Sequence, residues 1–447
     1  MTAVAAYAER RDALVAALHA RGPGPIRLRK ETSNLFRDRA RHAGSALDAR
    51  AFDHVLQVDA ARNYVDAEGL VTYERLVAAT LAHGFMPAVV PELKTITLGG
   101  AAAGVGIEAS SFRHGLVHET LLELDVLTGS GQVVTCARDG AHADLFYGFP
   151  NSYGTLGYAL RLRARVVPVR PYVAVTRRRF DNAEAFFAAV AAACDGDADF
   201  VEGVAFAPGE LYLCEGRFAS QAPYVSDYTY TQVFYRSVRT RSEDYLTVHD
   251  FIWRWDTDWF WCSSNLGAQN PLLRRVYGRK RLGSHTYQKI MRWNSRWGIT
   301  RRIDALRHGY RESVIQDVDI PIAHAARFLT FFQREVPIAP VWICPLRAGA
   351  DADRFALYPM RPGALYVNFG FWDVVRSAEA HAPGHFNRLI EDEVRALSGI
   401  KSLYSDSYYT REAFDALYGG AAYAALKARY DPGGAFPGLY DKTVLKA

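Results

Sequence analysis

Hydrophobic and polar positions in the first 170 residues predict strands, a helix and a hairpin in alternation. Residues 54–59, 63–67 and 158–166 have the spacing of strands, and residues 121–136 are typical of a β-hairpin with a glycine-containing turn. Residues 72–84 begin with a threonine suited to an N-cap and end with a glycine, which predicts a helix. The pattern therefore indicates a domain built from antiparallel strands with helices between them.

Beyond Pro171 the pattern changes, and residues 180–194 and 386–397 have helical spacing. The strand-like segments of this region are residues 200–206, 210–215, 314–321, 340–345 and 365–370. The last three are expected to share one mixed sheet. We therefore predict an α+β protein with a first domain at residues 1–172, a second at 173–398 and a C-terminal segment at 399–447.

Residues 91–115, PELKTITLGGAAAGVGIEASSFRHG, are dominated by glycine and other small residues. Such a run is expected to make a poor helix, and it leaves the backbone open to close approach by another group. Neutral donors are added by four hydroxyls, those of Thr95, Thr97, Ser110 and Ser111. The stretch predicts a backbone wall against a long anionic cofactor.

Two other interpretations of this stretch were considered. Residues 104–109 fit the dinucleotide pattern G-x-G-x-x-A, which should follow a strand and open a helix. Here the pattern follows glycine and alanine and leads into Ser-Ser-Phe-Arg, so we discount it. The other alternative is a glycine-rich turn that binds nothing.

Residues 248–261, VHDFIWRWDTDWFW, form the most aromatic stretch, and six of the eight tryptophans lie between Trp253 and Trp297. A buried aromatic cluster is the simplest interpretation. Asp256 and Asp258 lie inside it, and a buried acid needs a partner or has a raised pKa. Arg254 could supply that partner for one of them.

Residues 274–311 carry twelve lysines or arginines and a single acid, Asp304, with aromatic residues between them. This composition is typical of a solvated helical face or of contact with an anionic membrane surface. Nucleic-acid binding is disfavoured, because no nucleic-acid motif is present and the net charge is only +5.

The 447 residues include five scattered cysteines without a C-x-x-C pair, so neither a metal site nor a disulfide framework is indicated. A reducing cytoplasm is the simplest compartment. No apolar run approaches the roughly 18 residues that span a bilayer. Charged residues inside the first 22 positions predict an amphipathic helix rather than a signal peptide.

The order of motifs along residues 91–157 points to a particular class of cofactor-binding protein. It runs from the glycine-rich stretch through a hairpin with an acidic strand to D-L-F and G-T-L-G. This series resembles the FAD-binding domain of the vanillyl-alcohol oxidase superfamily, and the variants G-I-E and S-S-F-R-H-G resemble its Δ24-sterol reductase branch. The resemblance implies a PCMH-type, two-subdomain FAD-binding domain, an α+β substrate (cap) domain, and a C-terminal segment that returns toward the flavin.

The resemblance also implies which residues contact FAD. They are Ser33, Asn34, Pro91, Thr97, Gly99, Gly100, Gly104, Gly106, Ile107, Ser110, Ser111, Gly115, Gly154, Gly157, Tyr158 and Tyr404. The loop expected over the pyrophosphate, residues 32–37, lacks the glycines of the wider superfamily, although Arg37 and Arg39 could pair with phosphates. His42 matches no tethering motif, so FAD is expected to be non-covalent, with NADPH or NADH as the electron donor.

Several longer segments, including TSNLFR, FIWRWDTDWFWC and KSLYSDSYYTREAFDALYGG, resemble bacterial flavoproteins that reduce a methylene branch on the fatty acids of membrane lipids. Related proteins desaturate a methylated acyl chain on the way to furan fatty acids. This likeness implies a phospholipid-bound acyl substrate, a lipid methyltransferase as partner, and peripheral contact with the inner face of the membrane. The alternatives are a Δ24-sterol reductase-like enzyme, an FAD oxidase of a polar alcohol and a non-catalytic lipid-binding module.

Reduction of a branched alkene has no carbonyl group to polarise, so protonation can come first and leave a tertiary carbocation. Such a reaction needs a desolvated acid and aromatic faces that tolerate a cation. The expected catalytic residues are Glu108, Asp256 and Tyr408. Asp258 is a further acid with a strong structural alternative, and Tyr404 is expected to contact the flavin.

Overall fold

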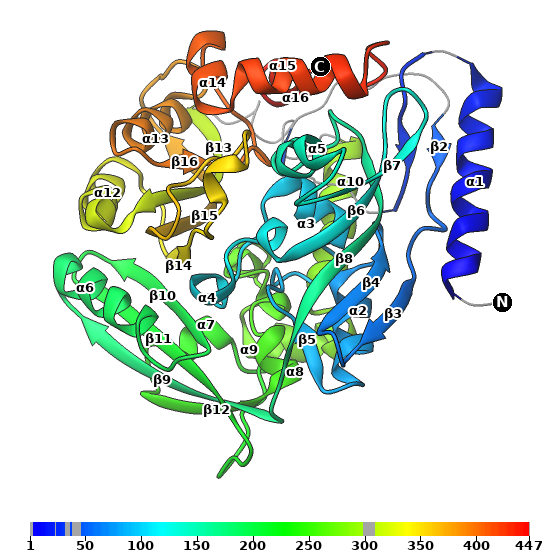
Figure 1. Cartoon of the computed structure of the whole chain (residues 1–447). Helices are drawn as coiled ribbons and strands as arrows, with labels where there is room; N and C mark the ends of the chain where they lie inside the picture. Colours follow the sequence, from blue (N-terminus) through cyan, green and yellow to red (C-terminus); the bar gives the residue numbers. More distant parts are fainter. Residues whose placement is uncertain (1–2, 23, 32–35, 38–45, 298–308, 447) are drawn as a thin grey trace.

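Two β-sheets organise the chain in the computed structural model, which describes residues 3–22, 24–31, 36–37, 46–297 and 309–446 (Figure 1). Ser33, Asn34, Arg39 and His42 lie outside the described residues. The predicted α+β class is confirmed.

The first sheet has six strands in the order β3-β4-β8-β6-β7, with β5 paired to β8. Its strands are β3 (Val55–Asp59), β4 (Tyr64–Glu68), β5 (Phe85–Pro87), β6 (Leu121–Leu127), β7 (Val133–Ala137) and β8 (Tyr158–Pro168). Helices α2 (Tyr73–Leu81), α3 (Leu98–Gly104), α4 (Ser111–His114) and α5 (Ala143–Gly148) lie between them in sequence. The predicted strands, the capped helix and the hairpin are therefore all present.

The second sheet has eight strands in the order β12-β9-β11-β10-β14-β15-β13-β16. They are β9 (Tyr172–Phe180), β10 (Phe200–Ala207), β11 (Glu210–Ala219), β12 (Glu243–Thr247), β13 (Tyr310–Pro321), β14 (Val341–Arg347), β15 (Leu365–Ser377) and β16 (Ile400–Lys401). It was expected to be mixed, but each of its strand pairs is antiparallel. The crossovers β9-α6-β10 and β13-α12-β14 do return the chain in the same direction, but β11 and β15 insert between the strands that they connect.

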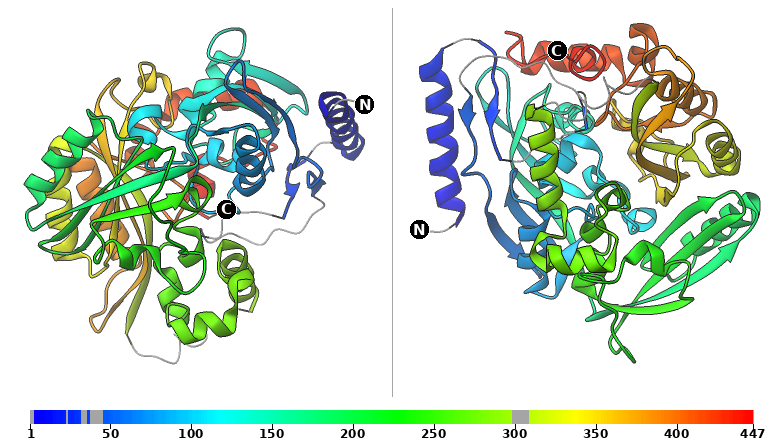
Figure 2. Two further views of the ribbon diagram at one scale, coloured as in Figure 1. Left: turned by 90° about the horizontal axis from the view of Figure 1, so that it is seen from below. Right: turned by 180° about the vertical axis from the view of Figure 1, so that it is seen from behind.

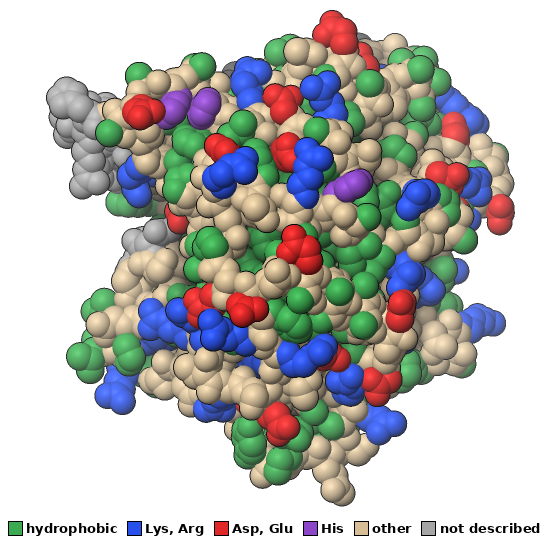
Figure 3. Space-filling model, turned by 90° about the vertical axis from the view of Figure 1, so that its left-hand side faces the viewer, with side chains coloured by type: hydrophobic (Ala, Val, Ile, Leu, Met, Phe, Trp, Pro, Cys, Tyr) green, Lys and Arg blue, Asp and Glu red, His purple; other side chains and the backbone are tan. Residues whose placement is uncertain are grey.

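Helices α6 (Ala183–Cys194), α12 (Ile322–Glu335) and α13 (His385–Ala396) cover the outer face of this sheet, on the left of Figure 1. The core beneath them includes Val318, Phe328, Phe369 and Ile390. The space-filling view of this left-hand side of the molecule shows acidic and basic side chains interspersed over the surface (Figure 3). Because side chains alternate along a strand, the residues between the core positions point toward the first sheet.

Residues 234–297, which follow β11, contain four further helices. They are α7 (Phe234–Ser237), α8 (Val248–Ile252), α9 (Pro271–Tyr277) and α10 (Ser284–Trp297). None of the helices in the described stretches is long and apolar enough to cross a membrane.

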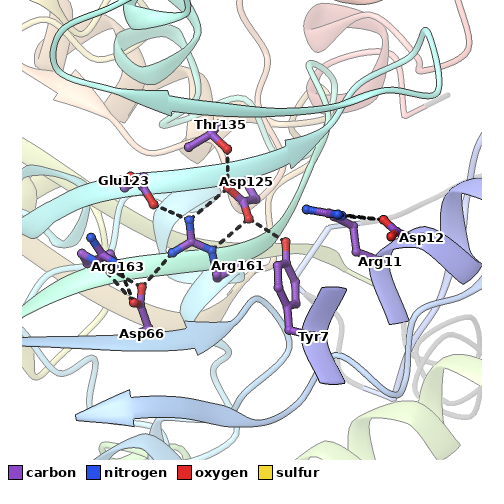
Figure 4. A network of polar contacts seen from close by, with 9 residues as sticks. All are labelled: Tyr7, Arg11, Asp12, Asp66, Glu123, Asp125, Thr135, Arg161 and Arg163. Atoms are coloured by element: carbon purple, nitrogen blue, oxygen red, sulfur yellow. Dashed lines mark hydrogen bonds and ion pairs between the residues drawn. The ribbon is translucent and has the colours of Figure 1, made fainter. Parts of the chain in front are cut away.

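Helix α1 (Ala3–Arg21) lies along the outer edge of the first sheet, and the views from different sides agree on this place (Figures 1 and 2). A polar network holds it there (Figure 4). Arg161 on β8 binds Asp66 (2.9 Å), Asp125 (2.8 Å) and Glu123, and the Tyr7 hydroxyl donates to Asp125 (2.7 Å). One arginine thus links β4, β6 and β8 to the helix.

The chain after β16 touches both sheets. Helices α14 (Arg411–Leu417), α15 (Gly420–Tyr430) and α16 (Leu439–Thr443) run along one end of the molecule, at the top of Figure 1. The ammonium groups of Lys427 and Lys442 donate to the carbonyl oxygens of Thr155 (3.0 Å) and Tyr153 (2.6 Å). These contacts bring the C-terminal segment to the loop between α5 and β8.

Candidate functional site

The glycine-rich stretch was expected to be a poor helix, but it contains α3 and α4. Helix α3 forms because the Thr97 side chain caps it, accepting a hydrogen bond from the Gly100 N–H at 3.2 Å, and because three alanines fill its last turns. The helix ends at Val105, whose φ of 62° is uncommon for a β-branched residue. The stretch is thus a short helix with a bare surface.

Two of the expected cofactor glycines serve packing within the protein. A Cβ added at Gly99 would lie 2.7 Å from the carbonyl oxygen of Gly69. One added at Gly106 would lie 2.8 Å from Val117 and 3.0 Å from Pro91. These positions need glycine because another part of the protein comes close.

The accessible part of α3 carries no side chain larger than a methyl group. Gly100 is exposed, and Ala103 and Gly104 are partly accessible. A Cβ at Gly100 would lie 2.8 Å from the capping Thr97 hydroxyl, which would have to shift, and would meet no other residue within 4 Å. This bare backbone fits the close approach of a planar or phosphorylated group, so the residues present suit FAD.

The other residues that were expected to contact FAD either bind or pack against protein groups or adopt the backbone angles of turns. The Ser110 hydroxyl donates to the Ala88 carbonyl (2.8 Å), and the Ser111 hydroxyl accepts from the Glu108 N–H (3.1 Å). Gly115, Gly154 and Gly157 have φ values of 74°, 77° and 147°. Ile107 is half-buried, and the Tyr158 ring packs edge-on against Phe436. Their contact with FAD remains a prediction.

Segments far apart in the sequence meet beside α3. Arg37 donates to the carbonyl oxygen of Leu403 (2.8 Å), and its guanidinium lies 5.3 Å from the centre of the Tyr153 ring. The ring of Phe36 lies edge-on to Tyr404, with centroids 5.9 Å apart. The structure therefore brings together the predicted phosphate-binding arginine and the predicted flavin-contacting tyrosine.

Tyr153 joins this group to α3, because its hydroxyl donates to the Gly104 carbonyl at 3.2 Å. The φ angles of Tyr153 and Asn151 are 50° and 60°, in the left-handed region that favours glycine. Such residues cost about 1–3 kcal/mol each and cluster at functional sites. Asn151 is held in place by Leu357, to which it donates (2.8 Å), and by Leu403, from which it accepts (3.3 Å).

Two carboxyl groups stand side by side on the face of β13 that points toward the first sheet. Asp319 accepts hydrogen bonds from the Tyr358 hydroxyl and the Asn368 amide, both at 2.7 Å. Burial raises the pKa of Asp319 to about 6. Burial, followed by the charge of Asp319, raises the pKa of Asp317 to about 7.

Tyr404 links Asp317 to the aromatic residues. Its hydroxyl is hydrogen-bonded to Asp317 and accepts from the Trp372 indole N–H at 2.8 Å. Asp317, Tyr404 and Trp372 stay partly accessible, yet burial is the largest cause of the raised pKa of both Asp317 and Tyr404.

The predicted aromatic cluster is present and continues from Trp372. The Phe260 ring lies 4.3 Å from Trp372, 5.1 Å from Trp255 and 5.6 Å from Trp342, measured between centroids. Trp259 and Phe260 have φ values of 47° and 60°, so two successive aromatic residues occupy the left-handed region. The protein holds this backbone strain where the aromatic wall is formed.

Arg254 lies at the other end of the aromatic cluster and binds three buried carboxylates. Its Nη2 is 2.7 Å from Glu92 and 2.8 Å from Glu108, and its Nε is 2.8 Å from Glu202. Burial, followed by the charges of Glu108 and Glu202, raises the pKa of Glu92 well above its usual range, despite the opposing charge of Arg254. The protonated form of Glu92 is therefore favoured over its carboxylate compared with an exposed glutamate.

The two acids in the aromatic stretch have other partners than Arg254. Asp256 accepts from the N–H groups of Lys94 (2.8 Å) and Ser284 (3.3 Å), and burial raises its pKa. Asp258 pairs with Arg274, while burial raises its pKa to about 6. Asp256 thus lies beside the segment that also carries Glu92.

Tyr408 lies apart from the other expected catalytic residues. Its ring packs where a Cβ on Gly384 would be, at the start of α13, and its N–H donates to Glu391 of the same helix (3.1 Å). Because α13 covers the outer face of the second sheet, Tyr408 is on the opposite side of that sheet from Asp317. The structure brings Glu108 and Asp256 near the same segment but not Tyr408.

Sequence reasoning missed Glu92, Glu202, Asp317 and Trp372. A signal existed for two of them. Glu92 lies in the Pro-Glu motif of the glycine-rich stretch, and Asp317 precedes Asp319 by two residues in a predicted strand, which puts both on one face. No local signal pointed to Glu202 or Trp372.

Comparisons with known proteins bear on the class of this site. Residues 2–137 match the family model described as "FAD binding domain". Human Delta(24)-sterol reductase is 27% identical over 412 residues, covering 87% of this chain and 75% of the relative, and the Arabidopsis thaliana protein of that name is 25% identical over 452 residues, covering 92% and 78%. Cytokinin dehydrogenase 7 of Oryza sativa subsp. japonica is 37% identical over 123 residues, covering 28% and 23%.

The chain thus carries an FAD-binding domain and is homologous to the Δ24-sterol reductases over most of its length. It is an FAD-dependent oxidoreductase of the class that acts on CH–CH groups, as predicted. The assigned cofactor, FAD, agrees with the bare face of α3 and with the convergence of Arg37, Tyr153 and Tyr404 beside it.

Arg254→Met should lower the free energy of unfolding by about 3–5 kcal/mol, because it leaves three buried carboxylates without their cation. The unpaired carboxyls will have raised pKa values in the folded state, so the loss should be larger at pH 8 than at pH 5. Urea denaturation at both pH values measures this loss in the free energy of unfolding. Arg217→Met, which breaks an exposed pair with Asp197, is the control, and equal stability of the two variants would contradict the assignment.

Gly100→Val should strongly reduce FAD binding, because the new side chain occupies the bare face of α3 and displaces the capping hydroxyl of Thr97. Flavin is measured by absorbance in the supernatant after acid precipitation, which also tests the expected non-covalent binding. Gly433→Val is the matched control, since a Cβ there would meet nothing within 4 Å. Normal flavin content in Gly100→Val would remove this face of α3 from the cofactor site.

Proposed function

We propose that the protein reduces a carbon–carbon double bond in a branched, long lipid chain. The preferred substrate is a methylene-branched fatty acyl chain of a phospholipid, and the product is the methyl-branched chain. The observation that carries the proposal is the meeting of a protonatable carboxyl, Asp317, with the aromatic wall at Trp372 and Phe260. NADPH or NADH is the proposed electron donor, and FAD is proposed to bind without a covalent tether.

The chemistry of an unactivated alkene fits these residues. A carboxyl that keeps its proton near neutral pH can protonate the methylene carbon, and the tertiary cation formed is stabilised by aromatic faces. Reduced FAD, when bound, supplies the hydride that completes the reduction. The indoles of Trp255 and Trp342 both donate to Glu202 (3.0 and 2.9 Å), which fixes their rings in the wall.

A second candidate is reduction of the side-chain alkene of a sterol, which the similarity to the Δ24-sterol reductases favours. That alkene is also branched and unactivated, so the same acid and wall would serve. A desaturase of a methylated acyl chain would run the chemistry in the opposite direction. An oxidase of a polar alcohol fits less well, because the residues around Phe260 offer few polar groups to such a substrate.

We also propose that the protein binds the membrane surface from the cytoplasmic side through α9 and the part of α10 that carries Trp293. Leu272, Leu273 and Val276 are 67%, 43% and 78% exposed, and Trp293 on α10 is 57% exposed. The exposed cations beside α9 are Arg275, Arg279, Lys280 and Arg281. An apolar tip ringed by cations suits the interface of an anionic bilayer.

Arg274, the first residue of the basic stretch predicted to face a membrane, is fully buried on Asp258 and contributes nothing to this surface. A lipid methyltransferase that adds the one-carbon branch is the proposed partner, because its product would be the substrate.

Incubation of the reduced holoenzyme with a phospholipid that bears a methylene-branched chain should convert it to the methyl-branched chain. Mass spectrometry of the fatty-acid methyl esters should show a gain of two hydrogens, with one deuterium taken from D₂O. A Δ24-unsaturated sterol, a methyl-branched lipid under air and a polar alcohol are run in parallel. Turnover of only one of these would establish the corresponding alternative, and turnover of none would reject redox chemistry on this range of substrates.

Replacing Leu272 and Val276 together with serine should weaken binding to vesicles that contain phosphatidylglycerol by at least tenfold, because two apolar side chains leave the interface. Binding of the wild type should also weaken as salt rises, since charge attraction is screened within about 10 Å at 0.1 M salt. Vesicle flotation measures both effects. Serine at Val4 and Leu445, two other exposed apolar residues, is the control, and an equal loss there would contradict the assigned surface.

A further inference from the structure

The carboxyl group of Asp317 has one oxygen without a hydrogen-bond partner, as the carboxyl groups of Asp258 and Glu92 also do, but those two pair with arginines, whereas no ion pair holds Asp317 among the described residues. Its Oδ1 is buried and makes no hydrogen bond within the described parts of the chain. That oxygen lies over Gly370, where an added Cβ would be 2.8 Å from Oδ1 and 2.6 Å from the ring of Trp372. An unpartnered buried oxygen calls for an explanation, and here it sits against the aromatic wall.

The carboxyl group of Asp317 is also held in position by residues on three sides. Asp319 flanks it on β13, Gly370 and Trp372 lie on β15, and the Tyr404 hydroxyl binds it while accepting from the Trp372 indole. Tyr404 also packs against Phe36, beside the bare face of α3. The carboxyl therefore stands between the predicted cofactor surface and the aromatic wall.

We propose that Asp317, oriented by Tyr404, is the proton donor to the substrate double bond. This inference rests on the proposed function and assigns a role that the sequence motifs did not indicate.

The contacts of the other buried acids argue against each of them as the proton donor. Glu108 and Glu202 are held by Arg254, and both oxygens of Asp256 accept backbone N–H groups. Asp258 is paired with Arg274, and Asp319 accepts two hydrogen bonds from Tyr358 and Asn368. Four of these acids engage both carboxyl oxygens in structural contacts. Asp258 keeps Oδ2 unpartnered, but its pairing with the Arg274 cation favours the carboxylate over the acid.

Burial also raises the pKa of Glu92, but this residue lies within the Arg254 cluster, among charges that would recapture its proton. Asp317 has no cation among its described partners. Its titration is governed by burial and by Asp319, both of which raise the pKa, and by Tyr404, which lowers it. Tyr153 is a further neighbour, and Arg37 lies over the ring of Tyr153.

The O–H bond of Asp317 breaks and a C–H bond forms at the less substituted alkene carbon, which leaves Asp317 as a carboxylate and the other carbon as a tertiary cation. Reduced FAD bound beside α3 would supply the hydride that this carbon needs, and the proposed nicotinamide donor would supply its two electrons. Water returns the proton to Asp317 after turnover.

Asp317→Asn tests this assignment in the holoenzyme. Turnover of the methylene-branched lipid should fall by 10²–10⁴-fold, while reduction of the flavin by the nicotinamide donor stays within about twofold of the wild type. Asp197→Asn, at an exposed surface position, is the control and should leave both rates unchanged. Full turnover by Asp317→Asn would overturn the proposal.

Two further readouts do not depend on turnover. Infrared spectroscopy of the wild type should show a carboxylic C=O band that disappears as pH rises through about 7, and this band should be missing in Asp317→Asn. Because the folded-state pKa is raised, its stabilising contribution is present at low pH and is lost as pH rises through that pKa. The melting temperature of Asp317→Asn relative to wild type should therefore be higher at pH 8 than at pH 5.

Tyr404→Phe provides a second variant. It removes the hydrogen bond that lowers the pKa of Asp317, so the alkaline limb of the pH–rate profile should move to higher pH. An unchanged profile would overturn the role of this pair. A wild type that reduces no branched alkene would reject the proposed function, whereas an active wild type without the titrating infrared band would reject only the assignment of Asp317.

Discussion

The charge balance around Arg254 is the constraint on which the placement of the two sheets depends. Glu92 and Glu108 come from the glycine-rich stretch of the first domain, whereas Glu202 comes from β10 of the second sheet. Removing these charges from water costs several kcal/mol per ion, and only close pairing compensates it. A shift of one sheet against the other would leave a buried charge unpaired, so the cluster allows one arrangement of the interface.

That arrangement fixes the aromatic wall in turn. Glu202 accepts the indole N–H groups of Trp255 and Trp342, and the rings pack through Phe260 onto Trp372. The wall is thus tied to the ion cluster at one end and to Tyr404 at the other. Its strained backbone at Trp259 and Phe260 is tolerated because the packed rings on both sides hold it.

The sequence predicted the elements better than their arrangement. Alternation and caps located the strands and α2, because those signals are local. The mixed sheet was wrong because insertion of β11 and β15 between crossover strands depends on contacts that periodicity does not record. The poor-helix expectation was wrong because the cap from Thr97 and the alanines outweighed the glycines.

The site was predictable only in part for the same reason. The motif series located the segments that meet beside α3, including Arg37 and Tyr404. The partners of Arg254 are 146 and 52 residues away in the sequence for Glu108 and Glu202, so no spacing rule could pair them. Tyr404 and Tyr408 belong to one polar-aromatic run, and only the path of the chain after β16 shows that they lie on opposite sides of a sheet.

The contact between Arg37 and Leu403 joins residues 366 positions apart and has a consequence for biosynthesis. A ribosome adds roughly 5–20 residues per second, and N-terminal domains begin to fold first. The first sheet can form early, but the surface beside α3 lacks Leu403 and Tyr404 until the last tenth of the chain has emerged. The surface beside α3 is therefore completed only near the end of synthesis, after the residues of the first sheet have been made.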